Sequence, residues 1–186
     1  MKPWTLAVDV DEVCADLLGT WLSFYNIDHK TRLLAEDITS WDITPFLNPG
    51  TKDRFYAYLQ MSSLYQQVLP IPYARRAVNQ LRADGHRVLF VTSCFPGTIE
   101  AKRDWLVRWG FLPKDSSVDF LPVQDKALIR ADYLFDDRPE NVAEFARYGG
   151  RGVLVRREHN LAMNWPEAYT ISSLKDAPAW LRGEDI

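Results

Sequence analysis

The feature that most constrains this chain is an apolar run that ends in two carboxylates separated by a single residue. The run Trp4-Thr5-Leu6-Ala7-Val8 is typical of a buried strand, and Asp9-Val10-Asp11 follows it directly. Packing alone rarely favours such an ending, because an unpaired charge is costly to remove from water. A second acidic pair, Asp136-Asp137, follows the apolar run Tyr133-Leu134-Phe135. The sequence therefore predicts one metal site, where the ends of two distant strands meet.

The remaining apolar runs alternate with helical patterns, which is typical of a doubly wound α/β fold with a parallel sheet. Each predicted strand is short and bounded by polar or turn residues, as expected for strands that are buried on both faces. The predicted strands are Thr5–Val8, Arg87–Thr92, Val118–Leu121, Tyr133–Phe135 and Gly152–Val155. Helical spacing of apolar residues predicts helices from Ala74 to Leu81, Thr98 to Trp109 and Pro139 to Tyr148.

One stretch interrupts this alternation and predicts a small, mainly helical cap. Residues 17–69 contain no convincing buried strand, whereas Leu17 to Tyr25 and Thr51 to Leu59 have helical spacing. We therefore expect a core formed by residues 1–16 and 70–186, with the cap inserted after the first strand. The cap is rich in aromatic residues, which would suit a flat substrate but also serve ordinary packing. The candidates for substrate contact are Trp21, Phe24, Trp41 and Phe46.

Overall composition narrows the possible partners and compartment. The net charge of −3 over 186 residues argues against binding to a nucleic-acid polymer but permits a small phosphate ligand. Cys14 and Cys94 lie among apolar residues and are expected to be buried free thiols in a reducing compartment. The N-terminal residues do not have the pattern of a signal peptide, and no apolar run approaches the roughly 20 residues of a membrane span. We expect a cytoplasmic protein, with a homodimer as an open possibility.

Polar residues at the predicted strand ends form a set suited to phosphoryl transfer. Asp9 is the predicted nucleophile, and Asp11 is the predicted acid that protonates the leaving oxygen and then activates water. Thr92 and the backbone around Ser93 would bind phosphoryl oxygens, and Lys126 would offset negative charge. Lys102 and Lys114 are alternatives for that lysine, and both are assigned to the surface. The predicted Mg²⁺ ligands are Asp9, Asp11, Asp136 and Asp137, whereas the three histidines lack the spacing of a zinc site.

These motifs resemble those of the haloacid dehalogenase superfamily of phosphatases. Within that superfamily, Val13-Cys14-Ala15-Asp16, Thr92-Ser93 and the segment from Asp136 to Asn141 are similar to the 5′(3′)-deoxyribonucleotidase group. The resemblance implies a Mg²⁺-dependent phosphatase that acts on nucleoside monophosphates through an aspartyl-phosphate. Many members have glycine where this chain has Glu12, so the resemblance does not predict the geometry of that loop or of the cap hinge.

Several alternatives stay open from the residues alone. Asp137 could serve only as the N-cap of the helix that follows it. The same catalytic groups would also suit a sugar phosphate or another small phosphate ester. A catalytically silent binding module is a further alternative. A receiver-like phospho-acceptor domain is another, although the predicted third strand is followed by Pro122 rather than by an acceptor aspartate.

Overall fold

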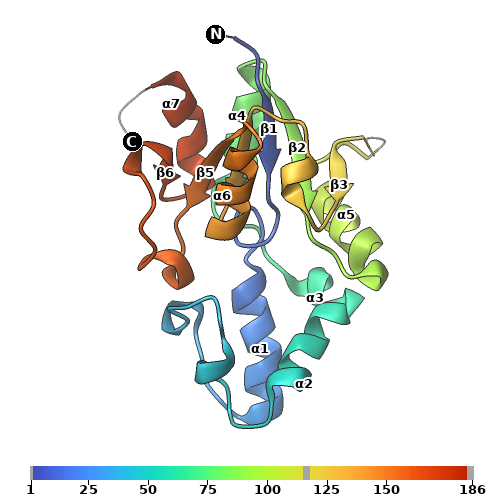
Figure 1. Ribbon diagram of the computed structural model, residues 1–186. Helices are drawn as coiled ribbons and strands as arrows, with labels where there is room; N and C mark the ends of the chain where they lie inside the picture. Colours follow the sequence, from blue (N-terminus) through green and yellow to red (C-terminus); the bar gives the residue numbers. More distant parts are fainter. Residues whose placement is uncertain (1, 115–117, 184–186) are drawn as a thin grey trace.

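A parallel six-stranded sheet lies at the centre of the computed structural model, which describes residues 2–114 and 118–183 (Figure 1). The strand order is β3-β2-β1-β4-β5-β6, and every pairing is parallel. The predicted doubly wound α/β fold is confirmed. Chain order reverses between the neighbours β1 and β4, which is where such sheets bind ligands. The strands are β1 (Thr5–Val8), β2 (Arg87–Thr92), β3 (Phe120–Pro122), β4 (Tyr133–Asp136), β5 (Arg151–Val155) and β6 (Thr170–Ile171).

Both faces of the sheet are covered, which explains why its strands are apolar without strict alternation. In β1, Leu6 and Val8 belong to a cluster shared with helices α4 and α5, whereas Ala7 faces the opposite cluster with Phe145 of α6. Gly152 lets α6 approach β5 closely, because a Cβ atom at this position would collide with the backbone of Val142. The central strands are therefore fixed from both sides, and their carboxyl ends are held in place.

The helices follow the predicted periodicity, with some differences at their ends. Among residues 2–114 and 118–183, none of them has the length and apolar composition needed to cross a membrane. The α-helices are α1 (Leu17–His29), α2 (Lys52–Ala57), α3 (Ser62–Gln67), α4 (Ala74–Ala83), α5 (Ile99–Arg108), α6 (Pro139–Arg147) and α7 (Ala177–Arg182). Short 3₁₀ helices are η1 (Ala35–Asp37), η2 (Thr44–Phe46), η3 (Tyr58–Gln60), η4 (Pro96–Thr98), η5 (Lys126–Leu128), η6 (Glu158–Asn160), η7 (Glu167–Tyr169) and η8 (Leu174–Asp176).

The third strand was placed too early by the sequence pattern. Val118 is 69% exposed and precedes the strand, which pairs with β2 from Phe120 to Pro122. Proline is tolerated there because β3 lies at the edge of the sheet. The two-residue strand β6 and the short helix α7 were not predicted, since both are too short to show a periodicity.

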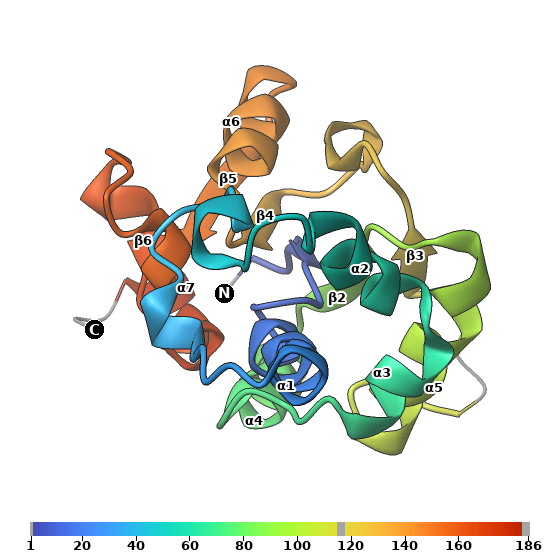
Figure 2. The same ribbon diagram turned by 90° about the horizontal axis from the view of Figure 1, so that it is seen from below.

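Residues 17–69 form a helical segment at the carboxyl ends of the strands (Figures 1 and 2). This segment, called the cap below, has a hydrophobic cluster of its own around Leu22, Tyr25 and Phe55. The chain entering it and the chain leaving it run side by side: the Asp16 amide donates to Leu69 O at 2.9 Å, and the Ile71 amide donates to Cys14 O at 2.8 Å. This pairing supports the predicted boundaries after residues 16 and 69, which remain a prediction.

The cap contacts the core on two sides of the strand ends. On one side, α3 packs on α5, and on the other side, η1 approaches η6. Viewed from the cap side, α1 lies between these two contacts (Figure 2). The space enclosed between cap and core contains the candidate site residues.

Candidate active site

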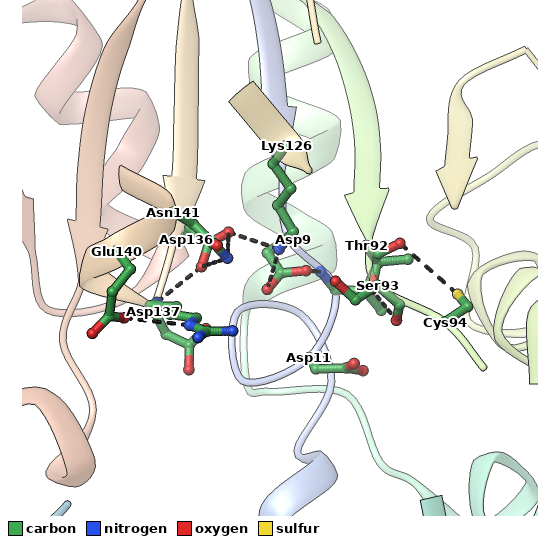
Figure 3. Close-up of polar contacts among 12 residues, drawn as sticks. Asp9, Asp11, Thr92, Ser93, Cys94, Lys126, Asp136, Asp137, Glu140 and Asn141 are labelled. Atoms are coloured by element: carbon green, nitrogen blue, oxygen red, sulfur yellow. Dashed lines mark hydrogen bonds and ion pairs between the residues drawn. The ribbon is translucent and has the colours of Figure 1, made fainter. Parts of the chain in front are cut away.

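Acidic side chains from two neighbouring strands converge at the point where chain order reverses. Asp9 directly follows β1, Asp136 is the last residue of β4, and Asp137 comes next. One carboxylate oxygen from each lies within 4.8 Å of the others, and all three side chains are buried. Figure 3 shows Asp9 between Asp136 and the end of β2 at Thr92. The predicted meeting of the first and the late acidic motifs is present in the structure.

Lys126 provides the positive charge nearest to this cluster. Its Nζ lies 2.8 Å from Asp9 Oδ2 and donates to Asp136 Oδ2 at 2.7 Å. The side chain is buried and enters from η5, above Asp9 in Figure 3. One ammonium group neutralises only one of the three carboxylates, so the cluster has an excess of negative charge.

The electrostatics of the cluster reflect this excess. Burial, reinforced by the charges of Asp136 and Asp11, raises the pKa of Asp9 to about 7, although Lys126 acts in the opposite direction. Burial likewise raises the pKa values of Asp136 and Asp137. Buried carboxylates with too little compensating charge are a suitable environment for a divalent cation, which prefers oxygen ligands. The cluster of buried aspartates could therefore bind a metal ion.

A second layer of side chains fixes the late acidic pair. Asn141 donates to both oxygens of Asp136, at 3.2 and 3.1 Å, and the Arg138 amide donates to Asp136 Oδ1 at 2.8 Å. His159 Nε2 lies 2.8 Å from Asp137 Oδ2. Helix α6 has Arg138 at its N-cap position, so the alternative of Asp137 as a simple cap is not what the structure shows.

Asp11 faces a different set of partners. Lys102 Nζ donates to Asp11 Oδ2 at 2.6 Å, and the Tyr65 hydroxyl lies 3.2 Å from Oδ1 and 3.4 Å from Oδ2. Among the described residues, the Asp11 carboxylate does not belong to the group that could hold a metal ion. The predicted metal role of its side chain remains a prediction that this geometry does not favour.

The assignment of Lys102 to the surface was wrong. Lys102 is 1% exposed and donates to Thr92 Oγ1 at 3.0 Å and to Ser93 O at 2.8 Å, in addition to Asp11. A signal was present in the sequence, because Lys102 shares the apolar face of α5 with Trp105 and Leu106. Lys114 is exposed, as expected.

The loop between Asp11 and α1 contains a left-handed backbone position that is occupied by Glu12 instead of glycine. Glu12 adopts a left-handed backbone conformation with φ of 57°. Its Oε1 accepts from the Leu18 amide at 2.7 Å in the first turn of α1, and its carbonyl oxygen accepts from Arg157 Nε at 2.5 Å. Burial raises the pKa of the Glu12 carboxyl to about 8. These contacts link the loop after β1 to the cap helix and offset the cost of the backbone conformation.

A cavity of about 410 Å³ opens above these groups, between the cap and the strand ends. Its size is in the range of small-molecule sites. Asp9, Asp11, Thr92, Ser93, Lys126 and Asp137 line it, as do the cap aromatics Trp21 and Trp41.

Two of the four predicted aromatic contacts lie elsewhere. Phe24 packs against both hydrophobic clusters, and Phe46 packs against the cluster of the cap. Within the described part of the chain, neither belongs to the cavity lining. Ordinary packing between helices accounts for both positions.

The cysteines agree with the prediction in one respect and differ in another. Both are free thiols, and Cys14 is buried. Cys94, however, is only partly buried and lines the cavity next to Ser93. The position of Cys94 follows from the loop after β2, which opens toward the ligand space.

Sequence reasoning missed several residues around the cavity. The three histidines, His159 among them, were judged to lack the spacing of a zinc site, and no contact with the acidic pair was predicted. His159 pairs with Asp137, and its ring lies 5.3 Å from that of Trp41. Arg138 lies over the same indole, with Cζ 4.9 Å from the ring centroid. No role was predicted for Tyr65, which also lines the cavity. These contacts join segments that are far apart in the chain, so they cannot be predicted from a local sequence pattern.

A family model for the 5′ nucleotidase, deoxy (pyrimidine), cytosolic type C proteins matches residues 3–180. The chain belongs to this 5′-nucleotidase family. It is therefore an enzyme of the phosphoric monoester hydrolase type. It is similar to the 5′(3′)-deoxyribonucleotidase of Clostridium acetobutylicum, with 28% identity covering 94% of this chain and 98% of the relative. A protein of the same name from Bacillus subtilis is 30% identical, covering 87% of this chain and 94% of the relative.

Solved structures confirm the fold of the 5′-nucleotidase chain as that of haloacid dehalogenase-type hydrolases. A hydrolase of this family from Deinococcus radiodurans, with bound phosphate and sodium, has a TM-score of 0.59 at 14% identity, covering 96% of this chain and 95% of the other. A haloacid dehalogenase-like hydrolase from Xanthomonas campestris has a TM-score of 0.60 at 13% identity, covering 97% and 95%.

Proposed function

We propose that this protein is a Mg²⁺-dependent phosphatase that hydrolyses deoxyribonucleoside monophosphates through an aspartyl-phosphate on Asp9. The observation that carries the proposal is the convergence of Asp9, Asp136 and Asp137 around one point, with Asp11 and Thr92 beside it under an aromatic-lined cavity. The names of the similar proteins, 5′(3′)-deoxyribonucleotidases, support the substrate class. The cytoplasmic location and a homodimer remain expectations.

Asp9, Asp136 and Asp137 would hold the Mg²⁺ ion. Their buried oxygens and the excess negative charge fit a small divalent cation. When bound, the ion would neutralise charge on the phosphoryl group and so reduce its repulsion from the attacking carboxylate. Lys126 also reduces the negative charge at the site, because its ammonium group contacts both Asp9 and Asp136.

In the first step, a carboxylate oxygen of Asp9 attacks phosphorus, and the bond from phosphorus to the ester oxygen breaks. The electron pair of that bond stays on the ester oxygen, which takes a proton from the carboxylic acid form of Asp11 and leaves as the nucleoside. In the second step, Asp11 takes a proton from water as its oxygen attacks phosphorus. The bond from phosphorus to Asp9 breaks, so inorganic phosphate and the free carboxylate are formed.

The phosphate itself would be held at the end of β2. The Thr92 hydroxyl accepts from Lys102, and its own contact with Ser93 O, at 3.5 Å, is long, so its hydrogen is available for a phosphoryl oxygen. Trp21 and Trp41 are the cavity-lining aromatics suited to contact the base and sugar. A different small phosphate ester, such as a sugar phosphate, is the alternative substrate.

The proposal is tested with a panel of phosphate esters that contains deoxyribonucleotides, ribonucleotides, sugar phosphates and p-nitrophenyl phosphate. Phosphate release is measured with Mg²⁺, with a chelator, and after Mg²⁺ is restored. We expect the highest kcat/KM for deoxyribonucleoside monophosphates and loss of turnover with the chelator. Preference for sugar phosphates would reject the nucleotide assignment, and unchanged turnover in the chelator would reject the metal dependence.

A further inference from the structure

The side chain proposed as the acid and base of the reaction is held by donors from two different parts of the molecule. Lys102 donates to Asp11 Oδ2 at 2.6 Å from α5 in the core, and the Tyr65 hydroxyl lies 3.2 Å from Asp11 Oδ1 from α3 in the cap. Asp11 itself is partly exposed, at 25% of its side chain, and faces the cavity. A partly exposed carboxylate has rotamer freedom unless donors hold it, so these contacts define its direction.

All three hydrogens of the Lys102 ammonium group are used in hydrogen bonds around Asp11 and the end of β2. The three hydrogens of its ammonium group match three acceptors, which are Asp11 Oδ2, Thr92 Oγ1 and Ser93 O. Burial acts to lower the pKa of Lys102, but the charge of Asp11 and the hydrogen bond between the two raise it above its usual value. The lysine therefore stays charged and ties the acid to the end of β2, where the phosphate would bind.

Tyr65 is the donor that the cap supplies to the Asp11 carboxylate. Its side chain is 4% exposed, and its ring lies 5.1 Å from Lys102 Nζ, so the phenol and the ammonium approach Asp11 together. The pKa of Tyr65 is raised well above its usual value by burial and by the charge of Asp11, which keeps the hydroxyl protonated and able to donate.

The position of Tyr65 is itself anchored to the core. Arg108 Nη2 of α5 donates to Tyr65 O at 2.7 Å, and Trp105 Nε1 donates to Val68 O at 2.9 Å. These bonds fix the end of α3 to the same helix that carries Lys102. The phenol therefore reaches Asp11 only when this part of the cap is seated on α5.

We propose that Lys102 and Tyr65 are a positioning pair that holds Asp11 toward the leaving oxygen, so that the acid is fully placed only with the cap seated. This inference rests on the proposed function, in which Asp11 protonates the leaving group. Removing the phenol would allow the carboxylate to turn away from the ester oxygen. The loss would therefore fall on proton transfer to poor leaving groups more than on substrate binding.

The test is the dependence of kcat/KM on the leaving group, because this constant reports the steps up to the first phosphoryl transfer. A series of aryl phosphates of increasing leaving-group basicity is measured together with a deoxyribonucleoside monophosphate, for the wild type and for Tyr65→Phe. We expect kcat/KM of the variant to fall about tenfold for the nucleotide but less than about twofold for p-nitrophenyl phosphate, whose leaving group needs little protonation.

The matched control is Tyr58→Phe. Tyr58 is also a buried cap tyrosine with a donating hydroxyl, but its partner is Asp28 within the cap. The dependence of kcat/KM on the leaving group should be the same for Tyr58→Phe as for the wild type. Lys102→Gln should steepen the dependence further, and Tyr65→Phe keeps the test decisive if that core variant fails to fold.

An equal loss for all leaving groups in Tyr65→Phe, or no loss at all, would overturn the positioning pair. Failure of the wild type on deoxyribonucleotides would instead reject the proposed substrate, and the aryl series would still decide on the pair. The two claims are therefore separated by one set of measurements.

Discussion

At the scale of single residues, the site depends on how burial and charge are distributed among its carboxylates. Asp9, Asp136 and Asp137 are buried with one lysine between them, whereas Asp11 lies at the cavity with its own lysine. This separation gives chemically similar side chains different neighbours: Asp9 shares Lys126 with Asp136, whereas Asp11 contacts Lys102 and Tyr65. The proposed nucleophile and the proposed acid thus differ in their partners rather than in their side-chain type.

Glu12 offers a test of these electrostatics through folding stability. Its folded pKa is raised by burial from the usual 4.5 to about 8. The folded protein therefore retains a proton that the unfolded chain releases, and the associated stability is present below pH 4.5 and lost as pH rises through 8. Glu12→Gln keeps an acceptor for the Leu18 amide but cannot ionise.

We expect the melting temperature of Glu12→Gln to rise relative to the wild type as pH increases from about 5 to about 9, measured in the presence of a chelator. The exposed Glu140 provides the matched control, since Glu140→Gln should show no such trend. A difference between Glu12→Gln and the wild type that stays constant over this pH range would contradict the assigned burial of the carboxyl.

At the scale of secondary-structure elements, the cap supplies two tryptophans to the lining of the cavity. Trp21 is fixed within the cap by stacking on Phe55, with ring centroids 3.9 Å apart, and by a bond from its Nε1 to Phe55 O at 2.6 Å. Trp41 is 51% exposed and lies against Arg138 and His159 of the core. One indole therefore forms a rigid wall, and the other lies at the boundary between cap and core.

Trp41→Ala should weaken nucleotide binding without disturbing the core. We expect KM for a deoxyribonucleotide to rise about fivefold, because a lost aromatic contact is worth about 1 kcal/mol, while turnover of p-nitrophenyl phosphate changes less than about twofold. The exposed Tyr148 at the end of α6 serves as the control through Tyr148→Ala. Equal KM values for Trp41→Ala and the wild type would show that this indole does not contact the substrate.

At the scale of the whole molecule, the order of the sheet brings distant motifs together. Asp9 and Asp136 are far apart in the sequence but follow adjacent strands, because β1 pairs with β4. The alternation of short apolar runs and helical patterns predicted this arrangement, and the acidic strand ends predicted the carboxylate cluster. The edge strand β3 and the two-residue strand β6 were harder to place, since their lengths give too few side chains for a pattern.

The parts of the site that sequence reasoning did not find depend on tertiary contacts. Lys102 lies on the apolar face of α5, yet its burial is understandable only once Asp11 and Thr92 are seen beside it. The pairing of His159 with Asp137 joins η6 to the loop after β4. Conversely, the aromatic character of Phe24 and Phe46 suggested ligand contact, although the packing of the cap already explains both.

Metal binding should stabilise the whole fold, because the buried carboxylates repel one another without it. We expect Mg²⁺ to raise the melting temperature of the wild type in a concentration-dependent manner and to do so less in Asp137→Asn, which lacks one proposed ligand charge. Asp104→Asn, on the exposed side of α5, should respond as the wild type does. Identical shifts in Asp137→Asn and the wild type would place the ion elsewhere.

The most direct test of the account is the turnover of a deoxyribonucleoside monophosphate by Asp9→Asn, compared with Asp132→Asn in the presence of Mg²⁺. Asp132 immediately precedes the amino end of β4 and accepts from the Thr5 amide at 2.8 Å, so it shares the sheet but not the site. We predict that Asp9→Asn loses at least about a thousandfold in kcat, whereas Asp132→Asn retains turnover close to that of the wild type. Phosphate release by Asp9→Asn at a rate comparable to that of Asp132→Asn would contradict the central claim that Asp9 is the nucleophile.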